Sequence, residues 1–368
     1  MAQDRRAERG PDGMSRPGVT AGLSVVATTR NDEHGGHLGA RMQLFVDGLA
    51  EQAERFRFPL ELILVEWNPP AERPPLLEAL RWATTDYFRP QVITVPRELH
   101  QSYPHADGLP LFQMIGKNVG IRRSTAPYVL ATNIDILLSD ELFSYLQTSL
   151  RPNAMYRVDR CDVLAELGGP VLPSPAECRA LPVLREHRID GLRYPNGRPP
   201  MPKRAARLDR LAVRPAAREL ARVTSAAWDR LVLPKLHTSG CGDFTLASRE
   251  IWFGMHGYPE WAAYSWHMDG VALFQAYSAG VEMINLEPPL VAYHLEHGEG
   301  SGWTPESNRL FDRLDAAGVP YLSTRAYRSM ARRMVRGRRS FHPINGEDWG
   351  LAGRELATAE PAAARPSA

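Results

Sequence analysis

The sequence predicts an α/β fold in which a mostly parallel sheet is flanked by helices. Short apolar runs rich in β-branched residues alternate with segments whose apolar residues recur at helical spacing. Such alternation is typical of parallel sheets, because the crossover between parallel strands is usually a helix. We expect strands over residues 23–29, 60–65, 91–95 and 128–132.

Composition and charge restrict the classes of partner. The chain has 368 residues and a formal net charge of +2, which argues against nucleic acid as a ligand. Its three cysteines, Cys161, Cys178 and Cys241, lie far apart, as suits a reducing compartment. The hydrophilic start predicts no signal peptide, and no apolar run reaches the roughly 18 residues of a membrane span. We therefore expect a cytoplasmic location.

Polar residues follow several of the predicted strands. Residues 28–32 end the first strand, Glu66 and Asn68 end the second, and Asn133 and Asp135 follow the fourth. A single polar strand end is commonplace, since it meets water. Several at the carboxyl edge of one sheet indicate a ligand site, because open α/β sheets bind ligands there.

One helix carries Lys117 and Asn118, and the apolar strand after it ends in Asn133-Ile134-Asp135. This order resembles the core of GT-A glycosyltransferases, especially those of family 2. In that family an Asp-x-Asp motif at the strand end holds a divalent cation against the diphosphate of a nucleotide sugar. Asn133 stands at the first acidic position here, so only Asp135 keeps the charge.

The resemblance implies which residues meet the donor. The first strand end and the acid of the second strand face the nucleoside, and the helix residues lie near the diphosphate or base. The donor-binding set is Thr28, Arg30, Asn31, Glu66, Lys117, Asn118, Asn133 and Asp135. For the helix residues, a solvated surface is the competing interpretation.

A second group of motifs lies beyond residue 238. Gly240-Cys241-Gly242-Asp243 resembles the glycine and acid segment that lines the acceptor side of these enzymes. Asp269, at the start of a helix that ends near Gly280, matches the catalytic base of the family. Aspartate is also a preferred helix N-cap, which is the competing interpretation. We expect Asp243 to bind acceptor hydroxyls and regard it as the rival base.

Aromatic and histidine residues complete the predicted site. Sugar rings stack on tryptophan, so we expect Trp266 and Trp303 at the acceptor, although core packing accounts for at least half of the nearby tryptophans. His294 and His297 follow an apolar strand at 289–292. The resemblance implies that His294, or alternatively His297, completes a Mg²⁺ or Mn²⁺ site with Asp135. A glycine-rich loop at 298–303 is expected to order over the donor.

Composition divides the rest of the chain. Arginine and lysine outnumber acids in a proline-rich insertion and again at 325–339. Two interpretations stay open for these basic stretches: a solvated brace, or contact with an anionic membrane at its inner face. The expected units are a disordered tail (1–20), a donor half (21–150), the insertion (151–237), an acceptor half (238–305), a helical extension (306–354) and a disordered tail (355–368).

The resemblance implies transfer of a sugar from a nucleotide-diphosphate sugar to a hydroxyl or amine, in polysaccharide, glycoconjugate or natural-product biosynthesis. The expected reaction is an inverting displacement in which Asp269 deprotonates the acceptor. Two alternatives remain. A sugar-phosphate nucleotidyltransferase shares the acidic nucleotide site, and a non-catalytic sugar- or membrane-binding protein shares the fold.

Overall fold

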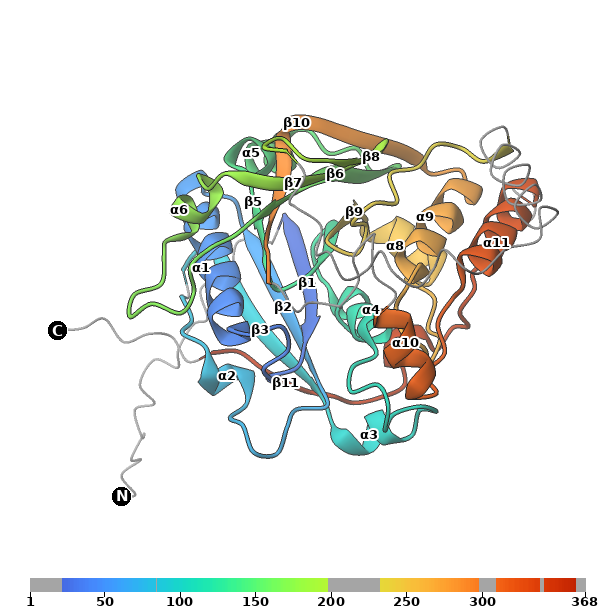
Figure 1. Cartoon of the computed structure of the whole chain (residues 1–368), viewed down its shortest axis with the longest axis horizontal. Helices are drawn as coiled ribbons and strands as arrows, with labels where there is room; N and C mark the ends of the chain where they lie inside the picture. Colours follow the sequence, from blue (N-terminus) through green and yellow to red (C-terminus); the bar gives the residue numbers. More distant parts are fainter. Residues whose placement is uncertain (1–21, 84, 198–231, 298–308, 338–340, 362–368) are drawn as a thin grey trace, which may run out of the picture.

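The structure is a computed structural model that describes residues 22–83, 85–197, 232–297, 309–337 and 341–361. One eleven-stranded sheet runs through it in the order β11-β3-β2-β1-β4-β9-β6-β10-β5, with β7 and β8 added beside β6 (Figure 1). The strands are β1 (Leu23–Thr29), β2 (Leu60–Trp67), β3 (Phe88–Val95), β4 (Tyr128–Thr132), β5 (Ile136–Leu138), β6 (Ala154–Val163), β7 (Val183–Arg188), β8 (Gly191–Arg193), β9 (Phe244–Ser248), β10 (Glu282–Leu295) and β11 (Ala357–Ala359).

Strand direction places one functional edge on this sheet. β3, β2, β1 and β4 are mutually parallel. β9 is antiparallel to both β4 and β6, and β10 is parallel to β6. The carboxyl ends of β1, β2, β4, β6 and β10 therefore share one edge of the sheet, where β9 begins. The predicted α/β class with a mostly parallel sheet is confirmed.

Helices cover both faces of the sheet, because successive strand residues point to opposite sides. Leu23 and Val25 of β1 pack with α1, α2 and α5 in one core, and Val26 packs with α4, α8 and α9 in the other. Each fully buried side chain of this size contributes about 1.5–3 kcal/mol. The helices are α1 (Leu38–Phe56), α2 (Leu76–Ala79), α3 (Arg97–Gln101), α4 (Gln113–Arg123), α5 (Asp140–Thr148), α6 (Pro175–Arg179), α8 (Arg249–Met255), α9 (Met268–Ser278), α10 (Arg309–Ala316) and α11 (Thr324–Arg336), with a 3₁₀ turn at Trp349–Leu351.

The segment predicted as a basic insertion at 151–237 begins inside the sheet. β6 lies between β9 and β10, so this part belongs to the core of the domain. Its charges hid the strand from the sequence pattern: Arg157, Asp159 and Asp162 are all buried. They are tolerated because each is paired or hydrogen-bonded inside the protein. Residues 198–231 of the predicted insertion lie outside the described part.

The C-terminal segment also differs from the prediction. A disordered tail was expected from residue 355, but β11 pairs antiparallel with β3 at the sheet edge. Backbone hydrogen bonds to an open strand edge need no apolar side chains, so composition does not reveal them. Arg123 holds the segment that leads to β11, because its guanidinium donates to the carbonyls of Gly350, Leu351 and Arg354 at 2.8, 3.0 and 3.0 Å. The predicted N-terminal tail, 1–20, and residues 362–368 of the predicted C-terminal tail lie outside the described residues.

The predicted helical extension contains α10 and α11, and α11 braces α9 (Figure 1). The Tyr327 ring stacks on His267 with 4.5 Å between ring centroids, and Ala331 is buried. None of the helices in the described part of the chain has the length and apolar character that crossing a bilayer would need.

Candidate active site at the carboxyl edge of the sheet

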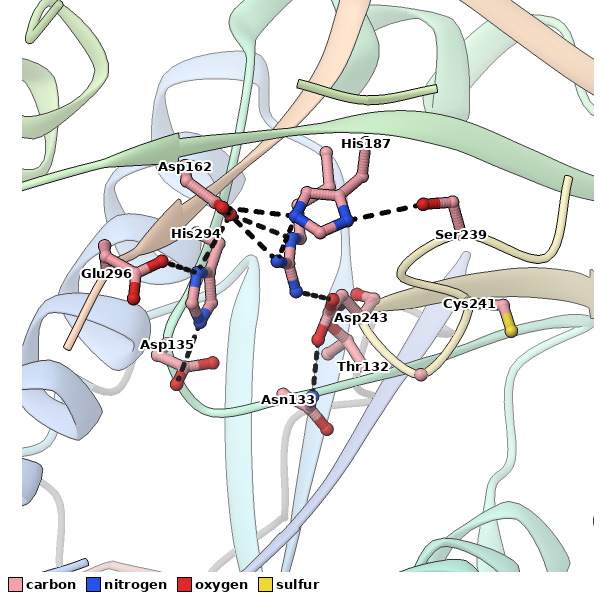
Figure 2. Close-up of polar contacts among 12 residues, drawn as sticks. Thr132, Asn133, Asp135, Asp162, His187, Ser239, Cys241, Asp243, His294 and Glu296 are labelled. Carbon is pink, nitrogen blue, oxygen red and sulfur yellow. Dashed lines mark hydrogen bonds and ion pairs between the residues drawn. The ribbon is translucent and has the colours of Figure 1, made fainter. Parts of the chain in front are cut away.

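Four strands bring polar side chains together at this edge (Figure 2). Asn133 and Asp135 follow β4, while Asp162 lies near the end of β6 and His294 near the end of β10. Asp243 comes from the opposite direction, directly before β9. These residues are far apart in the sequence and meet only because the strands that carry them are neighbours in the sheet.

Asp135, His294 and His297 form a compact set of metal-ligating groups. His294 Nε2 lies 3.7 Å and His297 Nε2 3.3 Å from Asp135 Oδ2. One ligand atom from each of the three residues lies within 4.8 Å of the others. Asp135 Oδ1 and His297 Nδ1 are buried without a hydrogen-bond partner among the described residues. Since buried polar atoms are normally paired, these atoms fit a bound cation or an ordered water.

Arg41, which the sequence did not single out, completes the surroundings of Asp135. Its Nη1 donates to Asp135 Oδ2 at 3.0 Å, and Nη2 donates to the carbonyls of His34 and Gly36 at 2.6 and 3.1 Å. Gly35, in this same loop, has a φ of +73°, and a Cβ there would lie 2.4 Å from His297 Nδ1. Arg41 therefore fixes the loop after β1 against the acid and the histidine.

The charges of this cluster reinforce one another. Burial would raise the pKa of Asp135, but the imidazoles of His294 and His297 bring it well below its usual range. Burial and Arg160 oppose protonation of His294, yet the carboxylates of Asp135 and Asp162 raise its pKa to about 9. The Asp135 carboxylate and the His294 imidazole therefore stabilise each other's charged forms.

Asn133 has a defined amide orientation. Lys117, which can only donate, donates to Asn133 Oδ1 at 2.8 Å, while Asn133 Nδ2 donates to Asp243 Oδ1 at 2.6 Å. A carboxylate at position 133 would face the Asp243 carboxylate at hydrogen-bond distance. The geometry thus explains why an amide, and not an acid, occupies this position.

Lys117 lies fully buried behind this pair and also donates to the Gly242 carbonyl at 2.6 Å. Burial lowers its pKa to about 8, against the opposing effect of Asp243, Asp269 and Asp135. The lysine therefore links the strand end of β4 to the glycine loop that precedes β9.

Asp269 stands on the other side of that loop. A Cβ on Gly242 would lie 3.3 Å from Asp269 Oδ2, so the carboxylate contacts the loop directly. The competing interpretation of Asp269 as an N-cap is wrong. His267, in the left-handed conformation with φ 66°, occupies the N-cap position of α9 without a side-chain capping hydrogen bond, and Asp269 lies in the first turn of the helix. Its Oδ1 accepts from its neighbour Gly270 N at 2.8 Å.

Two arginines of β6, the buried Arg157 and the mostly buried Arg160, shape the same loop. Arg157 donates to the carbonyls of His237, Cys241 and Ser239 at 3.0, 3.2 and 3.1 Å. Arg160 Nη1 donates to Asp243 Oδ2 at 2.6 Å. Sequence reasoning missed both; alternating charges in a run that otherwise resembles a strand were the only available signal.

The predicted residues of β1 and β2 lie at the same edge, and each has an internal contact. Thr28 donates to Val65 O at 3.1 Å, Arg30 to Asn68 O at 2.7 Å and Asn31 to Pro74 O at 2.7 Å, while Glu66 accepts from Leu76 N at 3.0 Å. Burial raises the pKa of Glu66. These contacts join the two strand ends and the chain that follows them.

Asn118 does not belong to the donor site. Its Nδ2 donates to Tyr258 O and Glu260 Oε1 at 2.8 and 2.9 Å, and its Oδ1 accepts from Tyr258 N at 2.8 Å. The side chain is completely buried and fully engaged, so it fixes the turn after α8 to α4 and is not available to a ligand.

Of the two predicted acceptor tryptophans, Trp266 is described and Trp303 lies outside the described residues, as does the predicted 298–303 loop. The Trp266 ring is half-buried and packs edge-on against Phe311, with 5.2 Å between centroids. Trp266 also lies three residues before Asp269, so it is near the start of α9.

No protein-family model and no curated protein matches the chain. Similar solved structures include the catalytic domain of Drosophila β1,4-galactosyltransferase 7 in complex with xylobiose. It has 11% identity and a TM-score of 0.35, over 82% of this chain and 81% of that chain. Staphylococcus aureus TarS gives 12% identity and a TM-score of 0.37, over 74% of this chain and 36% of that chain. The structure of TarS 1–349 has 11% identity and a TM-score of 0.41, over 86% of this chain and 71% of that chain. Likenesses this weak say nothing of activity, so function is argued from the side chains.

Proposed function

We propose that this protein is a glycosyltransferase that uses a nucleotide-diphosphate sugar and a divalent cation. The observation that supports the proposal is the convergence of Asp135, His294 and His297 on one point at the carboxyl edge of the sheet. A cation held there supplies positive charge that neutralises a leaving diphosphate. The motif resemblance to GT-A enzymes gives the reaction class.

The donor set also bears on the identity of the cation. Mg²⁺ prefers oxygen ligands, whereas imidazole nitrogen suits later divalent metals. With one carboxylate and two imidazoles, Mn²⁺ fits these residues better than Mg²⁺.

We assign the remaining side chains to the donor side or to the acceptor side of the site. The Lys117 ammonium lies beside Asn133 and adds positive charge on the donor side. The motif resemblance assigns the strand ends at Thr28, Arg30 and Glu66 to the nucleoside. Asp269, beyond the glycine loop, removes a proton from an acceptor hydroxyl or amine as that group attacks the anomeric carbon. A carboxylate on the side opposite the leaving group corresponds to inversion.

A nucleotide-release assay with a panel of sugar donors tests the proposal. We expect one donor to release its nucleoside diphosphate with Mn²⁺ present, more slowly with Mg²⁺, and not after chelation. Release of pyrophosphate from a nucleoside triphosphate and a sugar phosphate would instead show a nucleotidyltransferase. No release from any donor, with donor binding retained, would show a non-catalytic binding protein.

The solvated side of α11 supports a second, smaller proposal about location. The helix carries Arg325, Arg333 and Arg336 as exposed residues and no acid. We expect this face to contact anionic lipid, so the protein should float with anionic liposomes at low salt and remain in solution with neutral ones. Flotation that does not depend on lipid charge or salt would reject the proposed contact.

A further inference from the structure

His294 lies between two carboxylates, those of Asp135 and Asp162. β6 and β10 pair in parallel with His294 opposite Asp162, so the two side chains project from neighbouring strands on the same face. His294 Nδ1 lies 3.1 Å from Asp162 Oδ1, while Nε2 faces Asp135 Oδ2 at 3.7 Å (Figure 2). The ring thus spans two buried acids with its two nitrogens.

Asp162 is held rigidly. Its side chain is 1% exposed and forms ion pairs with Arg160 Nε at 2.9 Å and with Arg185, while His187 Nε2 lies 3.2 Å away. Burial would raise its pKa, but the imidazoles of His187 and His294 and the Arg160 guanidinium keep the pKa far below its usual range. Asp162 is therefore an acceptor-only group with a fixed position.

We propose that Asp162 is a positioning residue that holds His294 as an Nε2 ligand for the cation. A metal ligand must be the neutral imidazole, so His294 gives up one of its two ring protons when a cation binds. The neutral ring carries one N–H, and the nitrogen that donates it cannot also bind a metal. A carboxylate that accepts from Nδ1–H leaves the Nε2 lone pair directed toward Asp135 and His297. This inference rests on the proposed cation site, and names the residue that makes His294 competent for it.

Arg160 extends this arrangement to the acceptor half. The same guanidinium that pairs with Asp162 through Nε donates to Asp243 Oδ2 through Nη1 at 2.6 Å. Asp243 in turn accepts from Asn133. The orientation of His294 and the position of the glycine loop are thus set by one connected group of buried charges.

Glu296 is the alternative acceptor for Nδ1, and the geometry favours Asp162. Glu296 Oε2 lies 3.8 Å from His294 Nδ1, beyond hydrogen-bond distance. Its side chain is 27% exposed and is already paired with Arg185 at 2.9 Å. Glu296 therefore balances the charge of Arg185, while Asp162 orients the ring.

Nitrogen-15 NMR of the unmodified protein tests the orientation directly. With Zn²⁺ as a diamagnetic probe, we expect the His294 resonances to show a protonated Nδ1 and a metal-bound Nε2. The His294→Gln variant assigns the signal by its loss. The opposite pattern, a metal-bound Nδ1 with a protonated Nε2, would overturn the proposal without the need for any variant at position 162.

Calorimetric titration with Mn²⁺ tests the effect on affinity. Groups that orient metal ligands typically change metal affinity 10- to 100-fold, so we expect Asp162→Asn to weaken Mn²⁺ binding by about that factor. Asp159→Asn is the matched control. Asp159 is a buried acid of the same strand, but it contacts His237 and Arg188 at 2.9 and 3.2 Å, not His294. Unchanged affinity in folded Asp162→Asn, or equal loss in both variants, would overturn the proposal.

Neither binding readout needs turnover, so the proposal can fail separately from the proposed function. If a donor is found, a positioning role for Asp162 also predicts how the turnover of Asp162→Asn depends on Mn²⁺ concentration. Its turnover should recover at saturating Mn²⁺, because a correctly bound cation then fills the site. Turnover that stays low at full occupancy would assign Asp162 to the chemistry and reject positioning as its role.

Discussion

Changing Asp135 to asparagine should abolish cation-dependent donor binding and lower turnover by about a hundredfold or more. A cation supplies several kcal/mol of charge stabilisation to a leaving diphosphate, and each 1.36 kcal/mol corresponds to a factor of ten in rate. Asp135 supplies the carboxylate of the cluster with His294 and His297. Calorimetry with Mn²⁺ and the nucleotide-release assay measure the two effects. Unchanged donor affinity in Asp135→Asn, both with Mn²⁺ and after chelation, would contradict the prediction.

Folding has to be checked in the same variant. Asp135 pairs with the buried Arg41 at 3.0 Å, and removal of one partner of a buried pair typically costs about 3–5 kcal/mol. We therefore expect a lower melting temperature, and turnover must be normalised to folded protein.

Asn133→Asp is the informative companion variant. It restores the Asp-x-Asp pattern of the GT-A motif, so a simple reading of the motif predicts tighter cation binding. The structure predicts the reverse, since the new carboxylate would face Asp243 where Asn133 now donates at 2.6 Å. We expect weaker cation binding and a lower melting temperature. Tighter Mn²⁺ binding would show that the amide is not required by Asp243.

The parallel part of the sheet could be predicted from the sequence, because the apolar pattern of a buried strand is complete within a few consecutive residues. The strands β1, β2, β3 and β4 are apolar runs whose periodicity is visible within a few residues, and all four were predicted. The strand predicted at 289–292 is longer at both ends, because β10 spans Glu282–Leu295 and therefore includes His294. The resemblance to GT-A enzymes, and not the strand pattern, implied that His294 or alternatively His297 joins Asp135. The structure brings all three side chains together.

The rest of the site depends on contacts between distant parts of the chain. Arg41 belongs to a helix whose pattern is otherwise ordinary, and its partner Asp135 is 94 residues away. Arg160 and Asp162 lie in a strand whose alternating charges imitate a solvated segment. Their burial is possible only because β7, β9 and β10 supply partners, and no spacing rule in the sequence encodes that pairing.

Asn118 and Asp269 show that a residue's position in a motif does not by itself determine the role of its side chain. Asn118 lies in the expected motif, yet its amide is used to fix the turn at Tyr258 and Glu260. A capping role competes with the role of base for Asp269, but His267 occupies the N-cap position of α9, in the left-handed conformation and without a side-chain capping hydrogen bond. A motif specifies a backbone position, whereas the task of the side chain depends on which partners fold against it.

Changing Asp269 to asparagine should lower kcat about 10²- to 10⁴-fold, which is the contribution of a general base. Asparagine is nearly isosteric and can keep the contact with Gly270 N through its side-chain oxygen, so the start of α9 should persist. Melting temperature and donor affinity should change little, because Asp269 is neither the helix cap nor part of the cation cluster. Thermal unfolding, donor calorimetry and nucleotide release at saturating acceptor measure the three quantities.

Asp243 is the rival base, and its contacts argue against that role. One carboxylate oxygen accepts from Asn133 and the other from Arg160, each at 2.6 Å. Burial would raise the pKa of Asp243, but the Arg160 guanidinium lowers it below the usual value. A carboxylate with a lowered pKa and two occupied oxygens is a weak proton acceptor. Asp243→Asn should therefore disturb the glycine loop and the melting temperature more than it changes the intrinsic rate of proton removal.

The two variants together decide the assignment, because they predict opposite patterns. Base catalysis by Asp269 requires that Asp269→Asn remain folded and bind donor while kcat falls at least a hundredfold. It also requires that Asp243→Asn lose stability and, once corrected for folded protein, retain more turnover than Asp269→Asn. If Asp269→Asn turns over normally and Asp243→Asn is inactive but folded, then Asp243 is the base that removes the proton from the acceptor. The hydrogen bonds from Asn133 and Arg160 must then rearrange when the acceptor binds.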